Sequence, residues 1–299
     1  MEERVNEPLA RYTTLRIGGP AEHLYQPQTT EELMSIVSHL QTTGEPWHIL
    51  GGGSNLLVSS FGVIGSVIRT VQMTDTKKLD TNLIEASSGV RLPHLARFAA
   101  SHNLAGLEFS VGIPGTVGGA VVMNAGAHSS CMADIIESVL VYDVLKNSLI
   151  TLSKEELGFT YRRSKIDLKH QVVISARLKL HEDLPENIEA KMRANEEYRL
   201  KTQPIGFPNA GSTFVNPEPK RGAGFLLDQA GAKGMTCGQA AVSALHANFV
   251  INLGQATSQD ATELLKRMQE LVYKTYDISL HPEWKTLGKF SDQDLTLWK

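Results

Sequence analysis

The chain has 299 residues, of which 41% are hydrophobic and 20% are charged, and its formal net charge at pH 7 is -3. This length and composition predict a globular protein with a substantial core and about two domains. The slightly acidic balance, without any basic block, argues against binding to nucleic acid or to an anionic membrane, and no apolar run reaches the roughly 18 residues that span a bilayer. Because residues 1–4 lack the apolar stretch of a secretory signal, we expect a cytoplasmic protein.

The two cysteines, Cys131 and Cys237, are far apart and form no C-x-x-C pair. This spacing disfavours a disulfide framework and a cysteine zinc site. We therefore expect no metal site, and we expect both cysteines to be small buried residues.

The first 50 residues predict a β-α-β unit. The polar segment 11–20 ends in a Gly-Gly-Pro turn. It contains Arg16, which is either an anion contact or a solvated surface arginine. A capping box at residues 29–32 predicts the start of a helix, and Gly44 predicts its end. The apolar positions of this helix are Leu33, Ile36, Val37 and Leu40.

The first glycine-rich segment follows a short strand, residues 47–50, and precedes a second strand, residues 56–58. It reads Gly51-Gly52-Gly53-Ser54-Asn55. A Rossmann fold needs G-x-G-x-x-G at the start of a helix, and both that spacing and that helix are missing here. Consecutive glycine amides can nevertheless form a nest for a phosphate, with two polar side chains as further donors.

The second glycine-rich segment covers residues 112–120 and continues into Asn124-Ala125-Gly126-Ala127. Strands at 65–70 and 83–87 and a helix from Leu92 to near Gly106 precede it. Four glycines and one proline within residues 112–119 cannot sustain a helix or pack a core. Such a segment suits a sharp bend that brings N–H groups close to a phosphate or a flat ring, and the alternative is an ordinary glycine-rich loop.

The middle of the chain predicts strands at 139–145 and 172–180, and the second has one apolar face. The residues of that face are Ile174, Ala176, Leu178 and Leu180. Between these strands, residues 159–164 form a polar turn with an aromatic residue and two arginines. The charged segment 185–200 predicts a solvated helix at a domain boundary.

The last third places Ser212 in a tight turn within residues 208–217, and the absence of G-x-S-x-G argues against a hydrolase nucleophile. A short helix is expected over 224–229 and a buried strand near 245–252. His246 is more readily explained as a core or turn histidine than as a metal ligand. A helix after Thr257 has the apolar positions Ala261, Leu264, Leu265, Met268, Leu271 and Val272.

Seven segments in chain order form one pattern. They are Thr14-Leu15-Arg16-Ile17-Gly18-Gly19, Gly51-Gly52-Gly53-Ser54-Asn55, residues 112–119 with Asn124-Ala125-Gly126, Tyr161-Arg162-Arg163-Ser164, Gly211-Ser212-Thr213-Phe214 with Asn216-Pro217, His246-Ala247-Asn248-Phe249, and Pro282-Glu283. Together they resemble the family of UDP-N-acetylenolpyruvoylglucosamine reductases, flavoenzymes that make UDP-N-acetylmuramate for bacterial peptidoglycan. The resemblance covers nearly the whole chain and looks closest to the smaller subtype of the family.

The resemblance implies an α+β architecture: an FAD-binding fold of the vanillyl-alcohol-oxidase type in two lobes, followed by a C-terminal α/β substrate-binding domain. The expected boundaries are 1–70, 71–184 and 185–299. It also implies one non-covalent FAD, NADPH as reductant, small-molecule substrates and no obligate protein partner.

The family's catalytic residues correspond to Arg162, Ser212 and Glu283. Arginine is suited to the negative charge that develops on a carboxylate-conjugated enolate, because its planar guanidinium group stays charged and can pair with a carboxylate through two hydrogen bonds. The resemblance gives Ser212 the role of protonating the enolate, and Glu283 that of orienting the same group or relaying a proton.

Two further sets of contacts are implied. The residues expected to bind FAD are Leu50, Gly51, Gly52, Gly53, Ser54, Asn55, Leu56, Gly112, Pro114, Gly115, Thr116, Gly118, Gly119, Ala120, Asn124, Gly126 and Ala127. The residues expected to bind the substrate are Tyr161, Lys201, Gly211, Asn216, His246 and Asn248.

Three positions depart from the family pattern, namely His128, Val215 and Trp284. Two alternatives stay open. One is another FAD oxidase of the same fold, for which His48 is the nearest candidate flavin-linking residue. The other is a non-catalytic nucleotide-sugar or flavin-binding module, which would be expected to lack at least one of the three catalytic residues.

Overall fold

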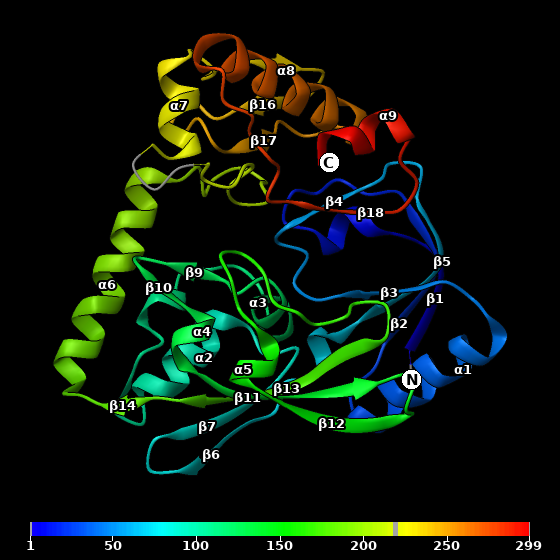
Figure 1. Ribbon diagram of the computed structural model, residues 1–299, viewed down its shortest axis with the longest axis vertical. Helices are drawn as coiled ribbons and strands as arrows, with labels where there is room; N and C mark the ends of the chain where they lie inside the picture. The colour runs from blue at the N-terminus through cyan, green and yellow to red at the C-terminus, as the bar shows by residue number, and fades with distance from the viewer. Residues whose placement is uncertain (1, 218–220, 299) are drawn as a thin grey trace. The chain divides into compact units, whose positions relative to one another are not determined.

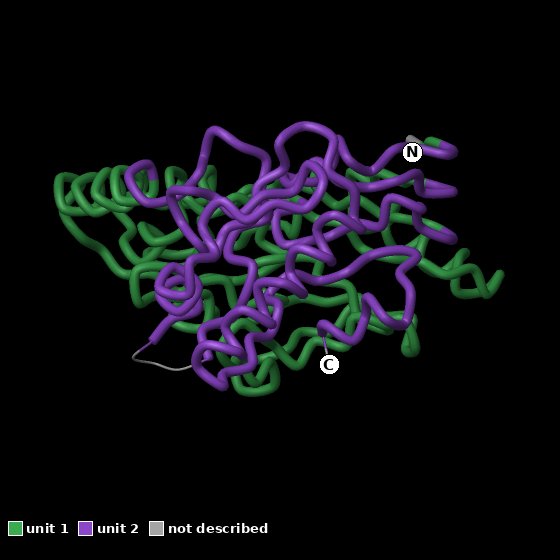
Figure 2. The backbone as a smooth tube through the Cα atoms, turned by 90° about the horizontal axis from the view of Figure 1, so that it is seen from above, with its two compact units in different colours: residues 1–4, 24–52, 66–199 green, residues 5–23, 53–65, 200–299 purple. Residues whose placement is uncertain are grey.

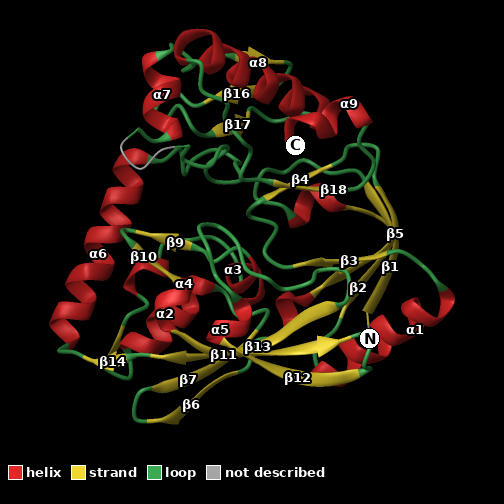
Figure 3. Ribbon diagram, in the orientation of Figure 1, coloured by secondary structure: helices red, strands yellow, loops and turns green. Residues whose placement is uncertain are grey.

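The computed structural model describes residues 2–217 and 221–298, and it contains both helices and strands throughout (Figures 1 and 3). The expected α+β class is confirmed. The chain forms two compact units, shown in green and purple in Figure 2. Unit 1 comprises residues 1–4, 24–52 and 66–199, and unit 2 comprises residues 5–23, 53–65 and 200–299. The three-part division expected from the sequence stays a prediction.

Unit 1 is built on a five-stranded sheet in which every neighbouring pair is antiparallel. In spatial order its strands are β12 (Ser148–Ser153), β11 (Ile136–Asp143), β13 (Gln171–Lys179), β7 (Leu83–Ser87) and β6 (Thr76–Asp80). The strands expected at 83–87, 139–145 and 172–180 are confirmed within a few residues. β12 was not predicted from the sequence, since only three of its six residues, Leu149, Ile150 and Leu152, are apolar.

Helices cover both faces of this sheet, so two separate cores form within unit 1. On one face lie α2 (Leu92–Ala100), α3 (Val117–Val122), α4 (Met132–Ile135) and α5 (Lys154–Leu157), and on the other lies α1 (Thr30–Thr43) (Figure 3). The apolar face predicted for β13 is wrong at one position. Ile174 joins the core under α1, whereas Ala176, Leu178 and Leu180 join the core under α2 and α3. The pairing of β11 with β13 shifts between Leu140 and Val141, and this irregularity changes the alternation of side chains.

The predicted start and end of α1 are confirmed. The Thr29 side chain accepts a bond from the Glu32 N–H, and Gly44 ends the helix in the left-handed conformation (φ 71°). The strand β3 (Trp47–Leu50) follows and pairs in parallel with β5 (Val63–Arg69). These two strands belong to a sheet of order β1-β2-β5-β3, with β1 at Glu2–Pro8 and β2 at Pro20–Gln26.

The charged helix expected near 185–200 is confirmed as α6 (Pro185–Thr202), which buries only Ile188 and Met192. The short elements of unit 1 are η2 (Thr70–Gln72), β8 (Leu104–Ala105), η3 (Glu108–Ser110), β9 (Gly126–Ala127), β10 (Ser130–Cys131) and β14 (His181–Glu182).

Unit 2 packs two helices against small sheets around its own core. Its longest helix, α8 (Ser258–Tyr276), has a capping box between Thr257 and Asp260, and its apolar face is buried as predicted except for the partly buried Leu271. The shorter helix α7 (Ala223–Gln229) is also confirmed. The strands of unit 2 are β15 (Thr236–Cys237), β16 (Ala240–Val242) and β17 (Val250–Asn252), and the parallel pair β4 (Leu56–Val58) and β18 (Lys285–Leu287). Three further short helices are η1 (Leu9–Tyr12), α9 (Asp292–Leu295) and η4 (Thr296–Trp298).

The expectation that both cysteines are buried is wrong, because both are partly exposed. Cys131 ends the two-residue strand β10, and Cys237 lies in β15 at the edge of its sheet. No helix within residues 2–217 and 221–298 is long and apolar enough to cross a membrane. The cytoplasmic location stays a prediction.

Candidate functional site

The two glycine-rich segments come together inside unit 1. Leu50 ends β3 and is fully buried, and Gly51 and Gly52 follow it. A Cβ atom on Gly51 would lie 2.6 Å from the Thr116 Oγ1, and one on Gly52 would lie 3.0 Å from the Gly115 Cα. Side chains at either position would therefore separate the two turns, so the close approach of the backbones explains both glycines.

The segment after β7 joins these turns. The Gly118 N–H donates to the Ser88 carbonyl (2.8 Å), and the Leu92 N–H donates to the Gly115 carbonyl (3.1 Å). The hydroxyls of Ser88 and Thr116 are buried, and neither has a hydrogen-bond partner within the described ranges. Because a buried hydroxyl without a partner costs about 1–3 kcal/mol, these two atoms are candidates for bonds to a polar ligand. No motif in the sequence marks Ser88 as a candidate, since only the tertiary pairing brings it beside Gly118.

Three further glycines expected at FAD differ in what surrounds them. Gly119 is exposed, and a Cβ there would meet only the Thr116 Oγ1, at 3.9 Å, so a ligand can approach its backbone. A Cβ on Gly112 would meet the Arg199 Cδ at 2.9 Å, and one on Gly126 would meet the Cys131 Cβ at 2.7 Å. Protein packing accounts for Gly126, whereas the nearest neighbour of a Cβ at Gly112 is a flexible arginine side chain. Of the other residues expected at FAD, Pro114 is exposed, Ala127 is partly buried and Ala120 is buried.

The first glycine turn passes into unit 2 at Gly53, followed by Ser54, Asn55 and the partly buried Leu56. The Gly53 carbonyl accepts a bond from the Thr14 N–H (3.1 Å). The Asn55 side-chain amide donates to the Glu283 carbonyl (3.2 Å), and its own carbonyl accepts from the Lys285 N–H (3.0 Å). Asn55, expected at the cofactor, thus holds the segment that contains Glu283.

Arg162 lies in a two-residue turn of unit 1. The Thr160 and Arg163 backbones bond to each other in both directions, at 3.0 and 3.2 Å, and enclose Tyr161 and Arg162. Arg162 has a φ of 57°, in the left-handed region that a non-glycine residue adopts at a cost. Its guanidinium carbon lies 5.3 Å from the centroid of the Tyr161 ring, which is 59% exposed.

Asn124 connects this turn to the end of α3. Its side-chain amide donates to the Thr160 carbonyl (2.9 Å), and its side-chain oxygen accepts from the Ala133 N–H (2.9 Å). The residue is 6% exposed and adopts a φ of 42°. Asn124 is among the residues expected at the cofactor from the sequence, and both ends of its side chain bond to protein.

Ser212 and Glu283 belong to neighbouring segments of unit 2. The Thr213 carbonyl, one residue after Ser212, accepts a bond from the Glu283 N–H (2.8 Å). Phe214 is bonded on both sides by the buried Asn248 side chain, whose oxygen accepts the Phe214 N–H and whose amide donates to the Phe214 carbonyl, each at 2.9 Å. Asn248 therefore fixes the segment that follows Ser212, and an isolated bridge between Phe214 and Pro282 brings the segments of two of the three predicted catalytic residues side by side.

The other residues expected at the substrate have varied surroundings. Gly211 is left-handed (φ 74°) and introduces Ser212, and a Cβ there would meet nothing within 4 Å. Asn216 accepts the Ala223 N–H (3.0 Å) at the start of α7, so its oxygen has a structural role. Lys201 is exposed, at the end of α6. His246 is half-buried, and its Nδ1 accepts the Asn248 N–H (3.1 Å), which fits a turn histidine.

Burial lowers the pKa of three groups near these segments. Burial lowers the pKa of His246, with the charge of Lys233 acting in the same direction. Burial also lowers the pKa of His48 and of Arg199. His48 pairs with Val67 inside β3, ahead of the glycine turn. Within residues 2–217 and 221–298, no cluster of His, Cys, Asp or Glu could hold a metal ion.

Two of the three departures from the family pattern are structurally unusual: His128 has a left-handed backbone (φ 52°), and the Trp284 indole N–H is buried without a hydrogen-bond partner among the described residues. The Val215 N–H donates to the His281 carbonyl (3.0 Å). The His128 ring packs edge-on against Tyr198, with ring centroids 5.4 Å apart. Trp284 is fully buried in the core of unit 2.

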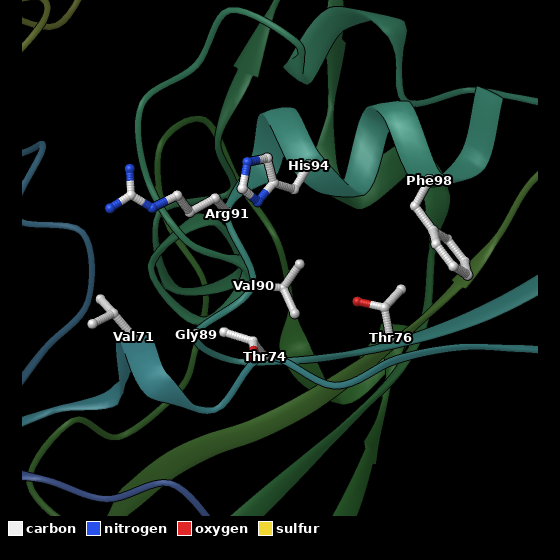
Figure 4. Close-up of a pocket in the computed structure, with 8 residues that line it drawn as sticks. All are labelled: Val71, Thr74, Thr76, Gly89, Val90, Arg91, His94 and Phe98. Carbon is white, nitrogen blue, oxygen red and sulfur yellow. The ribbon is translucent and has the colours of Figure 1, made fainter. Parts of the chain in front are cut away.

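A separate pocket of about 250 Å³ opens beside α2. Figure 4 shows His94 and Phe98 extending from that helix above Val90 and Thr76, while Arg91 points away from them. Val71, Thr74 and Gly89 complete the lining. No predicted site residue lines this pocket, which borders the segment between Ser88 and Leu92 that joins the two glycine turns.

Comparison with known proteins gives consistent matches. Residues 21–152 match the model of an FAD binding domain, and residues 203–287 match that of the UDP-N-acetylenolpyruvoylglucosamine reductase C-terminal domain. The chain is 42% identical to the UDP-N-acetylenolpyruvoylglucosamine reductase of Parasynechococcus marenigrum, over 95% of the chain and 96% of that protein. It is 40% identical to that of Caldanaerobacter subterraneus, over 95% and 93%. The crystal structure of the Thermus caldophilus reductase, 39% identical, covers 96% of the chain and matches over 98% of its own length with a TM-score of 0.80.

Proposed function

Because the chain belongs to the family of UDP-N-acetylenolpyruvoylglucosamine reductases, we propose that Arg162, Ser212 and Glu283 carry out the reduction of the enolpyruvyl group of its substrate. The protein is an FAD-dependent oxidoreductase that acts on UDP-N-acetylenolpyruvoylglucosamine in the synthesis of peptidoglycan precursors. The reductant that we propose is NADPH.

The residues of unit 1 fit a phosphate-bearing cofactor such as FAD. Gly51, Gly52 and Gly115 bring backbone N–H groups together without side chains, and the exposed Gly119 leaves its backbone accessible. The buried Thr116 hydroxyl adds a hydrogen-bonding group beside them. FAD held there would supply the hydride chemistry that links oxidation of NADPH to reduction of the enolpyruvyl double bond.

Arg162 would stabilise the negative charge that then develops on the substrate. Hydride addition at the β-carbon leaves an enolate conjugated with the carboxylate, and a guanidinium pairs with that group through two charge-assisted bonds. Each such bond contributes about 1.5–3 kcal/mol. The left-handed backbone of Arg162 supports this role, since strained conformations cluster at functional sites.

Ser212 would donate the proton that completes the reduction at the α-carbon. The observation that carries this assignment is the bond from the Glu283 N–H to the Thr213 carbonyl, which holds the segment of Glu283 beside the segment that contains Ser212. Serine is a weak acid, so a neighbouring carboxyl group that relays a proton, together with a fixed cation, would make the transfer feasible.

The test separates the two halves of the reaction by rapid mixing. In Ser212→Ala, NADPH should still reduce the flavin at nearly the normal rate. Reoxidation by UDP-N-acetylenolpyruvoylglucosamine should slow by about 10²–10⁴-fold, the range for a lost general acid. In Ser212→Cys, the thiol can donate a proton, so reoxidation should be faster than in Ser212→Ala. Equal slowing of both half-reactions in Ser212→Ala would show that Ser212 shapes the pocket and does not supply the proton.

A further inference from the structure

We infer that Asn124 is a positioning residue, which fixes the turn that carries Arg162 to the end of α3 and does not contact FAD through its side chain. The inference rests on the proposed role of Arg162. It assigns to Asn124 a function in the second half-reaction, when the substrate accepts the hydride.

The hydrogen bonds of Asn124 determine which way its side chain is oriented. The Ala133 N–H can only donate, so the atom facing it must be the oxygen, and the Thr160 carbonyl can only accept, so the atom facing it must be the amide nitrogen. Both bonds are 2.9 Å long, and the residue is 6% exposed. Losing the bond to Ala133 would remove a hydrogen-bond partner from a partly buried N–H, and losing the bond to Thr160 would release the turn from the side chain of Asn124.

A second bond anchors the other side of the same turn. The Ser164 hydroxyl donates to the Val122 carbonyl (2.9 Å). Val122 ends α3 and Asn124 follows it by two residues, so both anchors join the Thr160–Arg163 turn to the same helix end. A left-handed arginine persists only when its surroundings hold it, and these two bonds provide that restraint.

The helix α3 then relates the turn to the proposed flavin contacts. Its first residues include Gly118 and Gly119, which are expected to contact FAD, and its last residue is Val122, which anchors the turn of Arg162. The two groups of contacts are therefore separated by only about one helical turn of α3. A shift of the turn by about 1 Å can slow a reaction by about 100-fold when it misplaces a catalytic group. The binding of FAD, which needs only the first part of α3, should be unaffected.

The test variant is Asn124→Asp, which keeps the size of the side chain and the acceptor for the Ala133 N–H. It replaces the donor to the Thr160 carbonyl by a second oxygen, which repels that carbonyl. The matched control is Asn147→Asp. Asn147 is also left-handed (φ 47°), and its side-chain oxygen accepts the Tyr142 hydroxyl (2.7 Å), a bond that aspartate can keep.

Three measurements are made on both variants: flavin content after purification, the rates of the two half-reactions, and hydrogen exchange of the peptide that contains residues 160–164. In Asn124→Asp we expect normal flavin content, normal flavin reduction by NADPH, faster amide exchange in that peptide, and reoxidation by substrate slowed by about 10–100-fold. In Asn147→Asp all of these should remain normal. Combined with Arg162→Ala, Asn124→Asp should slow reoxidation by no more than about twofold further, because two residues that act through one group are not additive.

Each contrary outcome overturns the inference in a distinct way. Loss of flavin from Asn124→Asp would identify a cofactor contact. Full additivity with Arg162→Ala would show that Asn124 acts through another group. Unchanged amide exchange in residues 160–164 would show that Asn124 does not hold the turn. If Arg162→Ala itself left reoxidation unchanged, the proposed role of Arg162 would be wrong, and the positioning role would fall with it.

Discussion

Substitution of Gly119 by alanine is the most direct test of where the flavin lies. Gly119 occupies the third position of α3, its φ is not in the left-handed region, and a Cβ there would meet only the Thr116 Oγ1, at 3.9 Å. In the flavin-free protein the substitution should therefore stabilise the fold by about 0.5–1 kcal/mol, because alanine loses less backbone freedom in a helix than glycine. For a chain of this size the melting temperature should rise by about 1–4 °C.

When FAD is present, Gly119→Ala should destabilise the protein instead of stabilising it. If the cofactor packs against the Gly119 backbone, the added methyl group overpacks that contact at a cost of about 1–3 kcal/mol, which weakens binding by about 5–150-fold. A tenfold loss of affinity lowers the stabilisation by saturating FAD by about 1.4 kcal/mol, more than the helix gains. Thermal melts with and without FAD, together with a titration of flavin fluorescence, measure both effects.

Gly206→Ala is the matched control. No atom lies within 4 Å of a Cβ at Gly206, and its φ is not in the left-handed region, so alanine should leave FAD affinity unchanged. Gly118 is less informative than Gly119, because its Cβ would lie 3.0 Å from the Ser88 Cβ and would disturb the protein itself. Unchanged FAD affinity in Gly119→Ala would refute the placement of the cofactor against this turn.

Two further predictions concern unit 2. Thr257→Ala should lower the free energy of unfolding by about 1 kcal/mol, since the Thr257 hydroxyl accepts the Asp260 N–H (3.1 Å) at the start of α8. Chemical denaturation measures this change, and a decrease of less than a few tenths of a kcal/mol would show that the cap contributes little. The pKa of His246 is lowered from 6.5 in the folded protein, so the unfolded chain binds this proton more tightly and stability should fall as the pH drops below that value. Urea midpoints at about pH 7.5 and about pH 5.5 should differ less in His246→Asn than in the parent protein, and an equal difference would mean that His246 does not contribute.

Local patterns in the sequence were enough to predict most of the long elements. The helix α1 has both of its boundaries encoded in adjacent residues, a capping threonine and a terminal glycine, and α8 has a periodic apolar face and a capping box. The two glycine-rich segments could be recognised because glycine destabilises helices for reasons that apply to any chain. The expectation that the second segment cannot sustain a helix or pack a core is wrong, because the short helix α3 contains Gly118 and Gly119, and Gly118 is buried. The predicted catalytic residues came from the resemblance of whole motifs, since a single arginine or serine carries no such signal.

Other features depended on contacts between residues far apart in the sequence. β12 was missed because pairing with β11, and not its own composition, makes it a strand. Ile174 was placed on the wrong face because an irregular pairing with β11 changes the alternation. The roles of Asn124, Asn248 and Asn55 as anchors could not be read from the sequence, because a carboxamide can bind a ligand or a backbone group equally well. Only the folded structure places a carbonyl and an N–H within reach of each side chain, and that placement decides between the two.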